Sequence, residues 1–155
     1  MVGQLGKTAK APGFVATFNP IARRLLGAGV PLGPNALITI RGRKSGIDRT
    51  TPVALVEVEG RRWVLGTFGE TNWVLNLRAA RTATLTVGKR TEKVSAYELS
   101  KVEAAKYFRD VLAPYVRGIR FGRFLLRSVL GASEMLDDPD AAAEHRPVFE
   151  LTPAS

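Results

Sequence analysis

Apolar and polar residues alternate in several short runs along this chain, and turn residues bound each run. Alternation with a period of two is typical of half-buried β-strands. The pattern predicts strands over 36–41, 49–58, 61–67, 82–87, 92–99 and 147–152. Pro52 interrupts the second run, so we expect that strand to lie at a sheet edge or to be bulged there.

Helical signals occupy the stretches before, between and after these runs. Asn19-Pro20 is a typical helix start, with a capping side chain followed by proline at the first helical position. Ser100 and Glu103 form a capping box, and the helix that it opens is broken or restarted at Pro114. The predicted helices cover 20–28, 72–80 and about 100–113, and a basic amphipathic segment, 115–130, and an acidic loop, 131–144, follow them.

Antiparallel strands in a meander, with a few helices packed outside, favour an α+β fold built on a small β-barrel. A doubly wound sheet does not fit, because it needs a helix after most strands. No internal repeat is visible, and a length of 155 residues suits one domain. The sequence therefore predicts a single barrel domain over 1–155, in which 1–17 is a loose lead-in.

The chain is strongly basic and has no cysteine. Its formal net charge is +9 and its isoelectric point is about 10.5, which indicates an anionic partner such as nucleic acid, acidic lipid or a phosphorylated small molecule. Without cysteine there are no disulfides and no Cys-ligated metal sites. His145 is the only histidine, and we expect it to be a surface or strand-start residue in a metal-free protein. Because neither a membrane-spanning run nor a secretory signal is visible, the expected compartment is the cytoplasm.

One turn concentrates groups that bind anions. Between the first two predicted strands, the segment 41–46 (Arg-Gly-Arg-Lys-Ser-Gly) holds three cations, two glycines and a serine, and Arg49 follows it. Glycines let the backbone approach a ligand, successive N–H groups form an anion-binding concavity, and Arg and Lys add charge-assisted donors. The turn predicts a phosphate clamp. On spacing alone, the alternative is a solvated hairpin turn whose charges keep a strand end soluble.

Two longer motifs resemble the signature of one family, the deazaflavin-dependent nitroreductases. They are the turn 41–46 followed by Arg49-Thr50-Thr51-Pro52-Val53, and the block 66–80, Gly-Thr-Phe-Gly-Glu-Thr-Asn-Trp-Val-Leu-Asn-Leu-Arg-Ala-Ala. This family is a branch of the flavin/deazaflavin oxidoreductases, and the resemblance covers most of the chain. It implies an antiparallel split β-barrel of the FMN-binding type with helices packed outside. It also implies a site for the 8-hydroxy-5-deazaflavin coenzyme (coenzyme F-420), which carries a phosphodiester and an acidic oligoglutamate tail.

The resemblance assigns roles to individual residues. The family's phosphate grip corresponds to Arg43, Lys44, Ser45, Gly46 and Arg49, and its deazaflavin lining to Thr51, Pro52, Val53, Thr67, Phe68 and Gly69, with Trp73 at the pocket wall. The reduced coenzyme would pass a hydride to a quinone, a nitroaromatic compound or another unsaturated acceptor. The catalytic candidates are Thr67, as a hydrogen-bonding group, and Tyr115, which would close the acceptor side. Val74 stands where nitro-reducing members have a tyrosine, and Tyr115 is the nearest counterpart of their C-terminal tyrosines.

Other interpretations stay open at this stage. The same barrel holds FMN or haem in other proteins, and small relatives have been regarded as non-catalytic binders of fatty acids or other lipids. The segment 115–130 then becomes a lid, or a basic helix at the inner face of the membrane, whereas the plainer interpretation is a helix packed on the barrel. Nucleic-acid binding is disfavoured because the cations are spread and no recognition motif occurs. Split-barrel relatives often pair, so a homodimer is also considered.

Overall fold

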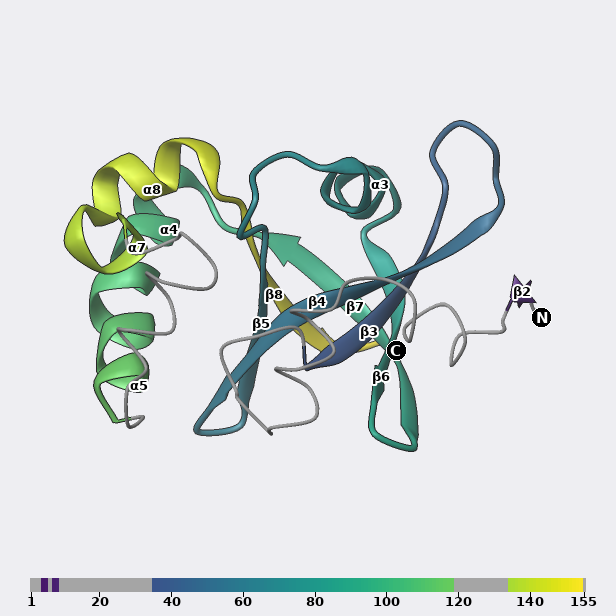
Figure 1. Cartoon of the computed structure of the whole chain (residues 1–155), viewed down its shortest axis with the longest axis horizontal. Helices are drawn as coiled ribbons and strands as arrows, with labels where there is room; N and C mark the ends of the chain where they lie inside the picture. The colour runs from purple at the N-terminus through teal and green to yellow at the C-terminus, as the bar shows by residue number, and fades with distance from the viewer. Residues whose placement is uncertain (1–3, 6, 9–34, 119–133, 155) are drawn as a thin grey trace.

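The computed structural model describes residues 4–5, 7–8, 35–118 and 134–154 of the chain (Figure 1). Within these residues, a β-barrel carries one helix across its end and a layer of helices along its side. The predicted helix 20–28 and the part of the basic amphipathic segment beyond Gly118 lie outside the described residues.

Six antiparallel strands close into the barrel in the order β3-β4-β5-β8-β7-β6. The barrel strands are β3 (Ala36–Arg41), β4 (Asp48–Val58), β5 (Arg61–Leu65), β6 (Thr82–Val87), β7 (Arg90–Glu98) and β8 (Val148–Pro153), and two short strands, β1 (Gln4–Leu5) and β2 (Lys7–Thr8), pair in parallel near the N-terminus. The barrel consists of two three-stranded meanders, not one, because the chain crosses the barrel end between β5 and β6 (Figure 1). A closed antiparallel barrel with helices outside confirms the predicted fold class.

Several strand ends differ from the prediction by one or two residues, since β7 begins at Arg90 and β8 begins at Val148, and the end of β5 has a clear reason. β5 ends at Leu65, two residues early. The Gly66 N–H still donates to the Pro147 carbonyl oxygen at 2.7 Å, but Pro147 has no N–H group to return a ladder bond. A Cβ atom on Gly66 would lie 3.0 Å from the Pro147 ring and 3.1 Å from its carbonyl oxygen. A side chain at this position would press against Pro147, so glycine suits the close approach.

Pro52 lies where β4 has a partner on one side only. β4 pairs with β3 through 48–53 and with β5 through 54–58. The Val53 carbonyl oxygen accepts a hydrogen bond on the β3 side, so the backbone nitrogen of Pro52 points to the other side, beyond the end of the β5 pairing. Proline is tolerated there because no ladder donor is needed. The predicted edge position is confirmed.

The helices form two groups (Figure 1). α3 (Asn72–Ala80) lies across one end of the barrel, and α4 (Lys101–Tyr107), the π-helical segment η1 (Phe108–Leu112), α5 (Ala113–Arg117), α7 (Glu134–Asp137) and α8 (Pro139–His145) form the side layer. The capping box is confirmed, since the Ser100 hydroxyl accepts from the Glu103 N–H at 3.1 Å and the Glu103 carboxylate accepts from the Ser100 N–H at 2.8 Å. Pro114 lacks an N–H group, and the chain is π-helical before the α-helix resumes around it.

The acidic segment was wrongly predicted to be a loop, because it contains α7 and α8. Asp138 caps α8 by accepting from the Ala141 N–H at 3.2 Å, and Pro139 occupies the first helical position. Met135, Ala142 and Ala143 are buried in the hydrophobic cluster between the side layer and the barrel. The charged residues of this segment therefore lie on two short helices whose apolar side packs into the hydrophobic cluster.

Two hydrophobic clusters hold these parts together. The barrel interior is filled from all six strands and closed by Val74 and Leu77 of α3, both fully buried. The second cluster lies between the outer barrel face, which contributes Trp63 and Leu65, and the side layer, which contributes Phe108 among others. Consecutive residues of β5 are therefore buried on opposite faces.

Candidate functional site

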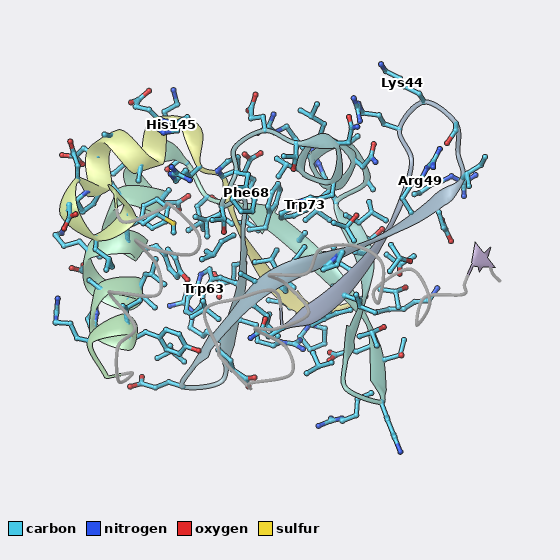
Figure 2. The ribbon with its side chains drawn as sticks, in the orientation of Figure 1. Lys44, Arg49, Trp63, Phe68, Trp73 and His145 are labelled. Atoms are coloured by element: carbon cyan, nitrogen blue, oxygen red, sulfur yellow. The ribbon has the colours of Figure 1, made fainter. Side chains whose placement is uncertain are left out.

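The predicted phosphate clamp is an exposed hairpin turn between β3 and β4. The Gly42 N–H donates to the Ile47 carbonyl oxygen at 2.9 Å, and the Gly46 N–H donates to the Gly42 carbonyl oxygen at 2.9 Å. Gly46 has a φ of +74°, which favours glycine, and the Ser45 hydroxyl accepts from the Ile47 N–H at 3.1 Å. Figure 2 shows Lys44 at the tip of the hairpin and Arg49 at the start of β4. The turn is thus closed by its own hydrogen bonds and carries exposed cations.

Arg43 anchors this turn to α3. Its backbone N–H and its guanidinium Nη1 both donate to Asn76 Oδ1, at 3.1 Å and 2.7 Å. Asn76 is 7% exposed and lies in the middle of α3. A buried amide oxygen with two donors fixes the turn against the helix. Part of the Arg43 donor capacity is therefore used within the protein, while Lys44 and Arg49 stay exposed.

The predicted ring-lining residues of the second motif form the loop 66–71. The Gly69 N–H donates to the Gly66 carbonyl oxygen and the Thr71 N–H donates to the Gly69 carbonyl oxygen, each at 2.9 Å. Thr67 is 8% exposed, and its carbonyl oxygen accepts from the Arg146 guanidinium. Phe68 is 71% exposed, so the loop presents an aromatic ring to solvent while its neighbour is buried.

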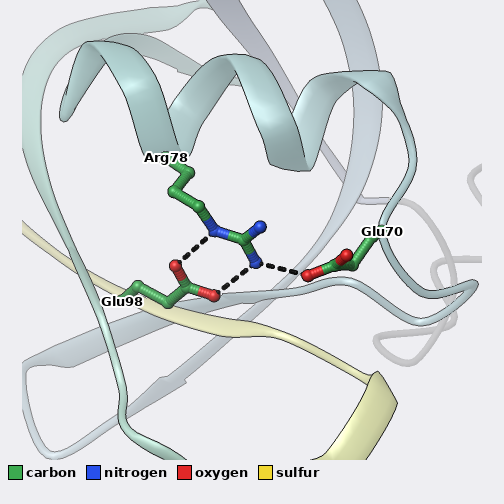
Figure 3. A network of polar contacts seen from close by, with 3 residues as sticks. All are labelled: Glu70, Arg78 and Glu98. Carbon is green, nitrogen blue, oxygen red and sulfur yellow. Dashed lines mark hydrogen bonds and ion pairs between the residues drawn. The ribbon is translucent and has the colours of Figure 1, made fainter.

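A charged network ties this loop to α3 and β7 (Figure 3). Arg78 Nε and Nη2 donate to the two carboxylate oxygens of Glu98 at 2.7 Å and 2.8 Å, and Nη2 also lies 2.8 Å from Glu70 Oε2. These contacts raise the pKa of Arg78, chiefly through the hydrogen bonds to Glu98. Because Glu70 follows Gly69 directly, the network fixes the position of the loop.

The free edge of β4 begins where β5 ends. Ala54 pairs with Leu65, so Thr51, Pro52 and Val53 continue β4 past the point at which the neighbouring chain leaves as the loop 66–71. Thr51 is half-buried, while Pro52 and Val53 are buried. The predicted ring-lining residues of both motifs therefore border the same gap in the strand pairing.

α3 connects the two halves of the candidate site. Its N-cap, Thr71, ends the loop, and Asn76 holds the basic turn. Asn76 lies five positions after Thr71, which is about 8 Å along the helix axis. Figure 2 shows Lys44 and Arg49 on one side of α3 and Phe68 on the other. The structure thus assembles the basic turn, β4 edge and loop around one short helix.

Two other predicted residues pack in cores. Trp73 is half-buried in the first turn of α3, and its ring lies 6.3 Å from that of Phe149. Tyr115 packs against the side-layer cluster, close to Tyr107, and burial raises its pKa. The structure therefore places Tyr115 in the side layer, away from the α3 end of the barrel (Figure 1).

A hollow of about 760 Å³ lies beside the loop, between it and the side layer. It is lined by Phe68, Gly69, Glu70, Lys101, Glu144, His145 and Arg146. Lys101 Nζ and Glu144 Oε1 form an ion pair at 2.8 Å that joins α4 to α8. Sequence reasoning named only Phe68 and Gly69 as site residues. Glu70 lies in the same motif without an assigned role, and His145 was expected at the surface, because nothing in the motifs indicates which helices pack beside the loop. Within the described residues, no cluster of His, Asp and Glu side chains suits a metal ion.

A family model described as F420H₂-dependent quinone reductase matches residues 17–119, more than half of the chain. The chain belongs to this family. Membership confirms the predicted oxidoreductase class and its dependence on coenzyme F-420. Among the described residues, no helix is long and apolar enough to cross a bilayer.

Solved structures with a similar fold are distant from this family member. An F420-H₂-dependent reductase (FDR-A) is 20% identical, with a TM-score of 0.45 over 77% of this chain and 94% of the other. A chain described as a domain-swapped dimer is 22% identical, with a TM-score of 0.47 over 84% and 92%. The haem storage protein HutZ from Vibrio cholerae is 15% identical, with a TM-score of 0.45 over 79% and 83%. A search of curated proteins gave no significant match. The assignment therefore rests on the family match.

The donor set of this quinone-reductase family member suits an anionic deazaflavin. Exposed Lys44 and Arg49 offer charge-assisted donors to a phosphodiester. At the other end of the site, the Thr71 hydroxyl is buried and has no hydrogen-bond partner among the described residues. An unpartnered buried hydroxyl is costly unless another polar atom reaches it. A ligand ring beside the loop 66–71 would bring such an atom.

Proposed function

We propose that this protein binds reduced coenzyme F-420 around α3 and transfers a hydride to a quinone or a similar flat acceptor. The observation that supports this proposal is the arrangement of an exposed basic turn and an exposed aromatic loop at the two sides of one helix. The family match supplies the identity of the coenzyme. Reduction of nitroaromatic compounds, as in the better-known relatives, stays a prediction.

Each part of the site has a separate task in this proposal. Lys44 and Arg49 bind the phosphodiester, assisted by Ser45, the Gly46 backbone and the remaining donors of Arg43. Thr51, Pro52 and Val53 form one border of the ring site. Thr67, Phe68 and Gly69 form the other, and Trp73 supports it from α3. When bound, the coenzyme supplies the hydride, and the protein holds donor and acceptor in contact and excludes water.

The test is a titration of the protein with oxidised coenzyme F-420, followed by tryptophan fluorescence, with FMN run alongside. The chain has two tryptophans, and Trp63 is buried away from the proposed site. A Trp63→Phe background therefore leaves Trp73 as the reporter. We expect saturable binding of the deazaflavin at micromolar concentrations, as in ordinary cofactor sites, and no comparable response to FMN.

Lys44→Ala and Arg49→Ala test the phosphate contacts. A charge-assisted hydrogen bond contributes about 1.5–3 kcal/mol, so each change should weaken coenzyme binding about 10- to 100-fold. Lys89→Ala and Arg90→Ala are the matched controls, since these cations lie at the β6–β7 hairpin. We expect salt to reduce the difference between variants and wild type. Equal losses in the control pair would show that only the overall positive charge matters.

If the protein binds FMN and not the deazaflavin, FMN takes the place of the proposed coenzyme. If it binds neither, the proposed mechanism is wrong.

Two further expectations are independent of this titration. Pairing into a homodimer stays a prediction that sedimentation equilibrium measures. Contact with the inner face of the membrane stays a prediction that flotation with anionic vesicles measures.

A further inference from the structure

The hollow beside the loop 66–71 has polar walls that the proposed coenzyme site does not use. It shares Phe68 and Gly69 with the proposed ring site, and its other walls come from the start of α4 and the end of α8. A volume of about 760 Å³ lies within the range of small-molecule pockets, roughly 300–1,000 Å³. The hollow is therefore both adjacent to the proposed ring site and large enough for a second small molecule.

Phe68 gives this hollow a flat apolar surface. Its side chain is 71% exposed, the largest exposed aromatic fraction among the described residues. The loop that carries it is held on both sides, by the Glu70–Arg78 ion pair and by the Arg146 hydrogen bond to the Thr67 carbonyl oxygen. An aromatic ring on a fixed loop at the edge of a hollow suits stacking with a planar ligand.

The remaining walls are polar and carry both signs of charge. Each carboxylate of the hollow has a cationic partner, since Glu70 pairs with Arg78 and Glu144 pairs with Lys101, and Arg146 and His145 add further nitrogen donors. Such walls suit a ligand with oxygen substituents better than an aliphatic chain. The chemistry of the hollow therefore matches a planar, carbonyl-bearing ring.

We propose that this hollow is the acceptor subsite and that His145 is the proton donor to the reduced acceptor. This inference rests on the proposed function. A quinone that gains a hydride, with its electron pair, from the reduced coenzyme also needs a proton on its oxygen. The His145 imidazolium breaks its N–H bond and gives that proton to the acceptor oxygen, and water then returns a proton to His145. The quinone is reduced, the coenzyme is oxidised, and its remaining proton passes to solvent.

His145 lines the hollow from the C-terminal end of α8, where the sequence predicted a surface or strand-start residue. It is the last residue of α8, and the Gly69 Cα lies close enough to its backbone that an added Cβ would come within 3.4 Å of the His145 carbonyl oxygen. The charged groups that face the hollow with it are Glu70 from the loop, Lys101 from α4, and its own neighbours Glu144 and Arg146. Imidazole is the side chain that most readily exchanges a proton near neutral pH.

The first test uses the fact that the chain has one histidine. The Hε1 proton of His145 therefore gives an unambiguous NMR resonance in the full chain. We expect menadione, a small naphthoquinone, to shift this resonance in a saturable way, both without coenzyme and with oxidised coenzyme F-420 bound. Phe68→Ala should abolish the shift, whereas Val87→Ala, which truncates an exposed side chain on the β6–β7 hairpin, should leave it unchanged.

The second test separates proton transfer from binding. General acid catalysis typically contributes 10²- to 10⁴-fold, so His145→Gln should lower kcat with menadione about 100-fold while the coenzyme Kd changes less than about twofold. The kcat of the wild type should depend on pH between about pH 5 and 8, whereas the kcat of His145→Gln should not.

The outcomes distinguish this inference from the proposed function. If the wild-type protein does not bind the coenzyme, the proposed function is overturned. The menadione-dependent shift of the His145 resonance then still decides whether the hollow binds quinones. Normal coenzyme binding with no shift of the His145 resonance, at menadione concentrations that saturate turnover, overturns the acceptor subsite. A wild-type kcat and pH profile in His145→Gln overturns the proton-donor role.

Discussion

Replacing Arg78 by methionine removes the centre of the Glu70–Arg78–Glu98 network and keeps most of the side-chain stem. Three short contacts are lost: two to Glu98, at 2.7 Å and 2.8 Å, and one to Glu70, at 2.8 Å. The three side chains are partly accessible, with exposed fractions of 38% for Arg78, 56% for Glu70 and 29% for Glu98. Solvent therefore screens the network to an intermediate degree.

The expected loss of stability follows from these exposures. An exposed ion pair contributes about 0.2–1 kcal/mol, and a well-formed charged hydrogen bond contributes about 1.5–3 kcal/mol. Removing two partly exposed pairs at once should therefore cost about 1–2 kcal/mol of unfolding free energy. For a domain of this size that corresponds to a Tm lower by roughly 2–8 °C.

The assay is thermal unfolding at neutral pH in low and high salt, with Arg61→Met as the matched control. Arg61 also forms a two-point contact with a carboxylate, Glu150, at 2.8 Å and 2.9 Å, but it is 62% exposed and has one acidic partner. We expect its loss to cost less than about 1 kcal/mol. A loss for Arg78→Met no larger than for Arg61→Met, or one that salt does not reduce, would refute the reasoning.

Three further predictions concern the loop, the side layer and the capping box. Gly66→Ala should lower stability by about 1–3 kcal/mol because its Cβ meets Pro147, whereas Gly118→Ala should be nearly neutral in the same denaturant titration. Tyr107→Phe should leave stability unchanged or raise it by up to about 1–2 kcal/mol, because it removes a buried hydroxyl that has no partner in the described part of the chain; calorimetry measures the change. The Ser100 N–H lowers the pKa of Glu103, so this carboxylate stabilises the fold above its unfolded pKa and the benefit is lost as pH falls through the folded value. The Tm gap between wild type and Glu103→Gln should therefore close between pH 7 and about pH 3.

The barrel could be predicted from sequence because its signals are local. β3 alternates buried and accessible residues, as its apolar pattern indicates, and the bounds of α3 and β6 match the prediction. The strand order could not be predicted in the same way. Pairing of β5 with β8 joins residues far apart in the sequence, such as Val64 and Phe149, which are 85 positions apart, and alternation alone does not select a distant partner. The described part of the acidic segment, 134–144, was mispredicted because its acidic composition hid a short apolar face.

In the candidate site, too, the local features could be predicted from the sequence and the contacts between distant residues could not. The basic turn and the loop 66–71 lie in continuous motifs, and a resemblance carried by consecutive residues identifies both. The contacts that place them depend on residues far apart in sequence, such as Arg43 with Asn76 and Thr67 with Arg146. His145 carries no motif at all, and only the packing of α8 beside Gly69 brings it to the hollow. In the proposed function, the motifs supply the groups that meet the coenzyme, whereas the groups that would meet the acceptor come from the side layer. Acceptor preference can therefore change through α4 and α8 while the coenzyme motifs stay the same.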